Sequence, residues 1–174
     1  MKFLLGFLFA IVLIAGGGWL YLKYGHVPVA ANDPAFPMEE DIVKVPLHSR
    51  IDRETQQPPF PASEDAFEAG AEIYKDECSS CHGLPGQEVD FSKWMYPAAP
   101  QLWRAHAKKK AGKKIVGVSD DDPGETFWKV KNGIRLTGMP SYQHILSDAE
   151  MWDVALLLKN ADQPLPDPVK AILK

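Results

Sequence analysis

Two cysteines and a histidine stand together near the middle of this chain, in the motif Cys78-Ser79-Ser80-Cys81-His82. The two cysteines are the only ones among 174 residues. Two thiols with two residues between them have four common uses in proteins: a zinc site, a redox-active pair, a structural disulfide and covalent attachment of haem. The rest of the sequence decides among these four.

Three of the uses need features that the sequence does not show. A structural zinc site takes four ligands, but no second cysteine pair exists and the other histidines, at positions 26, 48, 106 and 144, are scattered. A thioredoxin-like pair belongs to an alternating β/α pattern. A disulfide across two residues is strained and closes almost no loop. The motif therefore predicts one covalently bound haem c, with a thioether at Cys78 and at Cys81 and with His82 as an axial ligand of the iron.

The second axial ligand must come from a segment that covers the opposite face of the haem. Met139 lies in NGIRLTGMPSY, a loop in which Gly138 lets the backbone approach closely and Pro140 stiffens the residues after it. We therefore predict Met139 as the second iron ligand. The alternatives are Met95, Met151, His106 and His144.

Residues 63–174 carry the signals of a compact, mostly α-helical domain. Helix starts are marked by capping residues, and Glu125 and Glu150 are expected to complete capping boxes. Little alternation of polar and apolar residues supports a sheet. The predicted helices run from Ser63 to Cys78, from Asp122 to Asn132, from Ser147 to about Asn160 and, as a weaker candidate, from Gln101 to Ala111.

Residues 3–22 form one uncharged apolar run between two lysines. Twenty residues of helix span about 30 Å, the thickness of the hydrocarbon core of a bilayer. We predict a transmembrane anchor over residues 1–23. The alternative is a signal sequence that is cleaved near Val29-Ala30-Ala31.

Residues 24–62 contain seven prolines and show no helical period. We expect a flexible tether of roughly 35 Å average span that holds the domain away from the membrane. Within it, Ile42–Val45 is expected to pair as an edge strand or to lie along a partner.

The net charge of −4 argues against a nucleic-acid-binding protein, which is normally basic. One local exception is the lysine run Lys108–Lys110 with Lys113 and Lys114. This run is either a solvated surface or a docking patch for an acidic partner.

Residues 63–160 resemble the class I cytochromes c, which carry one haem with one histidine and one methionine ligand. The resemblance rests on AFEAGAEIYKDECSSCHG, on YPAAPQL, and on VKNGIRLTGMPSY followed by LSDAEMWDVALLL. It implies an all-α cytochrome c fold, with three to four helices around one covalent haem. It also implies the same four site residues: Cys78, Cys81, His82 and Met139.

The resemblance further implies that the first and last of these helices cross closely, with Gly70 and Tyr74 meeting Trp152 and Leu156. A proline carbonyl is expected to accept the second N–H of His82 and so to orient the ring. The candidates for that carbonyl are Pro85, Pro97 and Pro100. Three tryptophans are expected in the core or against the haem: Trp94, Trp103 and Trp128.

These features predict a one-electron carrier that is not an enzyme, because two strong ligands leave the iron no open position. Its partners are expected to be redox proteins of a membrane oxidase, reductase or dehydrogenase. Since haem c is attached outside the bacterial cytoplasm, we expect a single-pass inner-membrane protein with a periplasmic domain. The alternatives are a fixed cytochrome subunit of a larger complex and a haem enzyme or gas sensor that uses His144.

Overall fold

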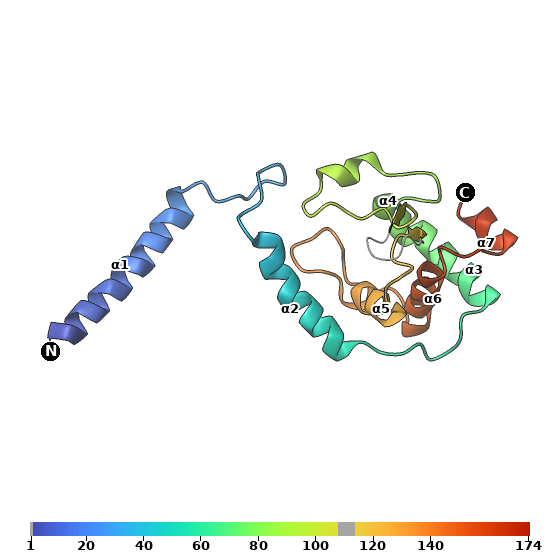
Figure 1. Ribbon diagram of the computed structural model, residues 1–174, viewed down its shortest axis with the longest axis horizontal. Helices are drawn as coiled ribbons and strands as arrows, with labels where there is room; N and C mark the ends of the chain where they lie inside the picture. Colours follow the sequence, from blue (N-terminus) through green and yellow to red (C-terminus); the bar gives the residue numbers. More distant parts are fainter. Residues whose placement is uncertain (1, 108–113) are drawn as a thin grey trace. The chain divides into compact units, whose positions relative to one another are not determined.

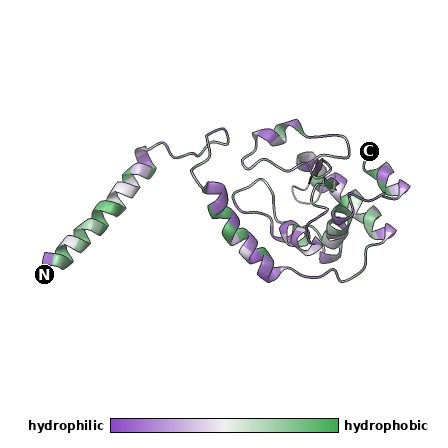
Figure 2. Ribbon diagram, in the orientation of Figure 1, coloured by the Kyte–Doolittle hydropathy of each residue, from purple (hydrophilic) through white to green (hydrophobic). Residues whose placement is uncertain are grey.

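The computed structural model describes residues 2–107 and 114–174. It contains two compact units, one that ends at Glu40 and one that spans Asp41–Lys174. In the first unit, helix α1 (Lys2–Tyr24) is apolar over most of its length (Figure 2) and is long enough to cross a membrane. A signal sequence meets the same criterion. The predicted boundaries at residues 23 and 62, which separate the anchor, the tether and the helical domain, therefore stay predictions.

Helix α2 (Glu39–Glu54) occupies a stretch for which we expected no helical structure, so that expectation is wrong. Pro46 lies inside this helix, although a proline removes one backbone hydrogen-bond donor there. Tertiary packing outweighs the local penalty, because the Ile51 side chain near the end of α2 is only 3% exposed. Ile42–Val45 is neither a strand nor extended, but belongs to the exposed first half of the helix.

The helix predicted from Ser63 to Cys78 forms in two successive parts. Helix α3 (Glu64–Ile73) begins where the Ser63 hydroxyl accepts a hydrogen bond from a backbone amide three residues later, at 3.2 Å. One π-helical turn, η1 (Tyr74–Cys78), follows it, and the short helix α4 (Ser79–His82) comes next. Such π-turns are frequent at functional sites. This one leads directly into the cysteine motif.

Helix α5 (Pro123–Asn132) lies where the sequence predicts it. The Asp122 carboxylate accepts the amide N–H two residues later at 2.7 Å, and Gly133, with φ of 65°, ends the helix. The expected capping box is wrong, because Glu125 does not reach back to the start of the helix. Its carboxylate instead accepts a hydrogen bond from the Lys129 ammonium one turn later, at 2.6 Å.

Helix α6 (Asp148–Lys159) also forms as predicted. Here the capping box is complete, because Ser147 accepts the Glu150 amide while the Glu150 carboxylate accepts the Ser147 amide. A further short helix, α7 (Asp167–Ile172), was not anticipated from the sequence. It forms after the prolines that end the preceding segment, and its neighbour Leu173 is buried.

The strands β1 (Ala105–Ala107) and β2 (Lys114–Val116) form a two-stranded antiparallel sheet. The weaker helix expected from Gln101 to Ala111 is therefore wrong in its described part. Strand pairing takes up the backbone groups that a helix would use, and the Gly117 amide also donates to the Arg104 carbonyl at 3.0 Å. Apart from Lys114, the lysine run lies outside the described residues.

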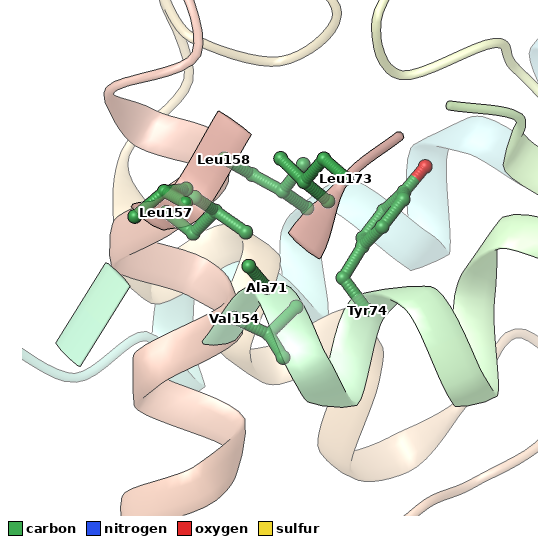
Figure 3. Packing of buried hydrophobic residues seen from close by; sticks show 7 residues of the cluster. Ala71, Tyr74, Val154, Leu157, Leu158 and Leu173 are labelled. Carbon is green, nitrogen blue, oxygen red and sulfur yellow. The ribbon is translucent and has the colours of Figure 1, made fainter. Parts of the chain in front are cut away.

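Two clusters of buried apolar side chains stabilise the second unit, and α6 contributes to both. The first joins α6 to α3, η1 and the C-terminal segment (Figure 3): Ala71, Tyr74, Val154, Leu157, Leu158, Val169 and Leu173. The second joins α6 to α5 and the loop between them: Phe127, Val130, Tyr142, Met151, Trp152 and Ala155.

The expected close crossing of the first and last motif helices is confirmed. A Cβ atom on Gly70 would lie 2.4 Å from a carbonyl oxygen of α6, so the two backbones are in direct contact. The expected partners differ, however. Tyr74 packs in the first cluster, whereas Trp152 stacks on Phe127 in the second, with ring centroids 4.1 Å apart. Leu156 belongs to neither cluster. Because α6 is buried on almost every side, its sequence does not indicate which face meets α3.

Replacing Gly70 with alanine is expected to lower the stability of the domain by about 2 kcal/mol, because α3 must move away from the α6 backbone to admit a methyl group. Thermal denaturation of the full-length holoprotein measures the effect. Glu72→Ala, an exposed change on the same helix, is the matched control and is expected to have little effect. Equal stability of the two variants would contradict the direct backbone contact.

Candidate functional site

One largely apolar cavity of the second unit brings together residues from the end of the first motif helix, the 95–102 segment, α5 and the loop before α6. All four residues that the sequence singles out line it: Cys78, Cys81, His82 and Met139. They converge although Met139 follows His82 by more than fifty residues. Their roles as ligands stay predictions.

Cys78 and Cys81 lie at the junction of η1 and α4 and are both free thiols. They are about one helical turn apart, and both face the cavity. Burial, together with the neighbouring Glu77 carboxylate and Cys81, raises the pKa of the Cys78 thiol to about 12. The thiol is therefore protonated at neutral pH and available for bond formation inside an apolar cavity.

The His82 ring is oriented by a hydrogen bond to the Pro100 carbonyl, which lies 2.7 Å from Nδ1. Because a carbonyl only accepts, Nδ1 carries the proton and Nε2 keeps a free lone pair for a metal. Burial lowers the pKa of His82, which favours this neutral form, while the Pro100 carbonyl acts in the opposite direction. Of the three proline carbonyls expected for this role, the structure selects Pro100 over Pro85 and Pro97.

Gln101 is a supporting residue that the sequence did not reveal. Its side-chain amide donates to the Cys81 carbonyl at 3.1 Å and to the Ser92 hydroxyl at 3.0 Å, and its side-chain oxygen accepts from the Val89 amide at 2.8 Å. These bonds join the cysteine motif to the segment that carries Pro100. The only available signal was its position directly after that proline.

The backbone just after the motif is similarly anchored. Gly83 has φ of 76°, and a Cβ atom there would lie 2.7 Å from the side-chain oxygen of Gln101. The Tyr74 hydroxyl donates to the Gly83 carbonyl at 2.8 Å. Because burial raises the pKa of Tyr74, this hydroxyl stays protonated and keeps donating. These contacts fix the position of the backbone directly after the motif.

Met139 is presented by a tight turn between α5 and α6. Its amide donates to the Thr137 hydroxyl at 3.0 Å, and its carbonyl accepts from the Ile134 amide at 3.3 Å. Leu136, at the tip of this turn, has φ of 62° and is 90% exposed. A left-handed backbone is uncommon for such a side chain and is often found at functional sites.

Tyr142 ties this loop to the cysteine motif. Its hydroxyl donates to the Glu77 carbonyl at 2.8 Å, and its amide donates to the Val130 carbonyl of α5 at 3.1 Å. Burial and the neighbouring Cys78 raise the pKa of Tyr142 to about 12, so the hydroxyl remains a donor at neutral pH. Tyr142 thus connects η1, which ends at Cys78, to α5 and to the loop that carries Met139.

Among the alternative ligands, only Met95 also lines the cavity. A Cβ atom on Gly138 would lie 2.4 Å from the Met95 methyl carbon, so the two loops touch. Met151 is fully buried in the second cluster, and His106 and His144 are exposed and do not line the cavity.

The three tryptophans do not share one environment. Trp103 packs against the first cluster and Trp128 is 6% exposed, as expected for core residues. Trp94 is 79% exposed and is therefore not a core residue, whereas the alternative that it packs against the haem stays a prediction. It lies beside Met95, at the surface of the segment that borders the cavity.

These residues fit a covalently bound haem c. The cavity offers two thiols at helical spacing, an imidazole with a fixed tautomer and a thioether from a separate loop, in apolar surroundings. Within the described part of the chain, no three histidine, cysteine, aspartate or glutamate side chains are grouped as a bare metal ion would require. The donor set therefore favours a haem over a zinc ion.

Comparison with known families gives a match for the central part of the chain. The sequence profile of the family described as "Cytochrome C oxidase, cbb3-type, subunit III" matches residues 65–158. The matched range begins in α3, ends in α6 and includes every residue of the cavity site. No curated protein matches the chain in sequence.

Proposed function

We propose that this chain, which belongs to the family of cbb3-type cytochrome c oxidase subunit III, carries single electrons through one haem held by Cys78, Cys81, His82 and Met139. The family and the fold establish a c-type cytochrome with covalent haem c that transfers electrons. The individual bonds are our assignment. Bound haem supplies the exchange of one electron between ferric and ferrous iron.

One observation supports this assignment above the others: His82 and Met139 come from separate elements and line the same apolar cavity as both thiols. His82 is oriented through Nδ1 by Pro100, which leaves Nε2 for the iron. With Met139 as the second ligand, the iron would have no open position for a substrate. The chain would then be an electron carrier, not an enzyme, and the thioether and the apolar lining would favour a high potential.

The place of action that we propose is the outer face of a bacterial inner membrane. Helix α1 would act as the anchor, and the haem domain would lie in the periplasm because haem c is attached outside the cytoplasm. Redox proteins in or at that membrane would be its partners. Detection of the intact N-terminus in the mature protein by mass spectrometry would support an anchor, and its loss would indicate a cleaved signal sequence.

A second candidate function is a fixed cytochrome subunit of a larger membrane complex. The family description names an oxidase subunit. In addition, α2 packs on the domain and leaves only about 14 residues between the end of α1 and the start of α2. A flexible chain of that length spans roughly 20 Å on average, which restricts how far the domain can travel.

Purification in mild detergent separates the two candidates. If the cytochrome migrates alone, with haem and protein in equal amounts, it is a mobile carrier. If it migrates in constant ratio with other haem or copper subunits, it is a fixed subunit. Absence of haem from the purified chain would contradict both.

The partner is expected to meet the domain at the exposed apolar side chains beside the cavity, Trp94 and Leu136. They are 79% and 90% exposed and adjoin the two loops that touch at Met95 and Gly138. Exposed apolar residues of this size commonly mark interaction sites.

Replacing both residues, as Trp94→Ser with Leu136→Asn, is expected to weaken partner binding roughly tenfold. Asparagine tolerates the left-handed backbone at position 136, so the turn is kept. The measurement is the concentration dependence of electron exchange with native membranes. Phe36→Ser, which changes an exposed apolar residue of the first unit, is the control. An unchanged dependence in the double variant would place the docking surface elsewhere.

A further inference from the structure

The chain just before the family-matched region forms a docked arm, residues 51–60, which lies against α5 (Figure 1). Ile51 is 3% exposed there. The indole N–H of Trp128, on α5, donates to the Glu54 carboxylate at 2.8 Å. The Arg50 guanidinium, just before the arm, lies 5.6 Å from the centroid of the same indole ring. The arm therefore makes specific polar and apolar contacts with α5.

The arm also touches the first turn of α5 through its backbone. A Cβ atom on Gly124 would lie 2.2 Å from the Gln56 carbonyl oxygen, so the backbone of the arm and the backbone of α5 are in van der Waals contact. Further along the arm, Phe60 packs against the second buried cluster. Met139 packs against the same cluster. The arm and the proposed distal ligand thus share one packed core.

Helix α5 connects the arm to the loop that carries Met139. The Val130 carbonyl, which belongs to a cavity-lining residue, accepts the Tyr142 amide at 3.1 Å. The Lys131 carbonyl accepts the Ser141 hydroxyl at 2.7 Å. The last turn of α5 therefore contacts the residues that directly follow Met139 in this loop.

We propose that the docked arm is a positioning element for Met139: by fixing α5, it keeps the methionine loop closed over the haem and so strengthens the bond between its sulfur and the iron. This inference rests on the proposed function, in which Met139 is the distal ligand. The proposal gives the docked arm a role at the haem site. This arm follows the part of the chain that leads back to the predicted anchor, α1. Loosening the arm is expected to make Met139 easier to displace from the iron, although every proposed haem ligand is still present.

Binding of imidazole to the ferric full-length holoprotein tests the proposal, because imidazole competes with Met139 for the iron. Two variants loosen the arm: Ile51→Ala removes its buried side chain, and Glu54→Ala removes the partner of the indole N–H. Each is expected to tighten imidazole binding about tenfold. For Glu54→Ala this factor corresponds to loss of one hydrogen bond to a charged group, and Ile51→Ala removes apolar packing worth at least as much. The Glu54 side chain is 43% exposed, so its variant is expected to fold.

Leu173→Ala is the matched control, because it truncates a side chain as deeply buried as Ile51 but in the first cluster, away from α5. Native-like imidazole binding by this control, with tighter binding by both arm variants, supports the inference. Native-like binding by the arm variants overturns it, as does an equal effect of all three, which would indicate general destabilisation. If the native protein lacks the optical band of methionine-ligated ferric haem, the ligand assignment fails, and the inference fails with it.

Discussion

Replacing Met139 with alanine is expected to abolish the optical band of methionine-ligated ferric haem and to lower the reduction potential by on the order of 0.1 V. The thioether is a soft ligand that favours ferrous iron, and in its absence water or another side chain occupies the position. The turn that presents Met139 is held by its own hydrogen bonds to Thr137 and Ile134, so the loop is expected to remain folded. Optical spectra and a redox titration of the purified variant measure both effects.

Met95→Ala and Met151→Ala are the controls for this experiment. Met151 is buried in the second cluster, so its variant loses stability but keeps the band. Met95 lines the same cavity as Met139 and is therefore the more demanding control. Persistence of the band in Met139→Ala, with its loss in Met95→Ala, would transfer the ligand role to Met95.

Replacing Cys78 and Cys81 together with alanine is expected to eliminate covalent haem. Each thiol is proposed to form one thioether bond, so each single variant keeps one attachment and the double variant keeps none. Both side chains are free and face the cavity, and no other cysteine in the sequence offers a substitute. A denaturing gel stained for haem reports the result directly, because only covalently attached haem stays with the unfolded chain.

Ser80→Ala is the matched control for the cysteine variants. Ser80 lies between the two cysteines and is exposed, so its variant is expected to retain haem at the native level. Haem that stays with the denatured double variant would show that attachment does not use the motif. Loss of haem in Ser80→Ala would show instead that the gel detects misfolding.

The local features of the fold were predictable because each depends on neighbouring residues. The capping residues Ser63, Asp122 and Ser147 each accept a hydrogen bond from a backbone amide within three residues, so sequence distance alone identifies them. Helix α2 was missed for the opposite reason. Its local signal is poor because of Pro46, and its stability depends on tertiary packing, which buries Ile51.

The supporting residues of the site were likewise predictable only in part. The motif indicates that His82 needs an acceptor for its second N–H, and it limits the acceptor to nearby carbonyls. Only the folded chain shows that Pro100 lies 2.7 Å away. Gln101 gains its importance in the same manner, since its residue type does not mark it. Met95 is one of four alternative ligands in the sequence, and only the fold places it at the cavity.

The sequence by itself determined the chemistry of this protein: two thiols and an imidazole in one helical segment suit one cofactor, and the family of the chain agrees with it. The tertiary structure decided which residues surround that chemistry. It brought Met139 and Met95 to one cavity, left Trp94 exposed and packed the arm from Ile51 onward against α5. The physical reason is that the reactivity of a side chain follows from its residue type and its near neighbours in the sequence, whereas a contact between distant residues exists only after the helices have packed.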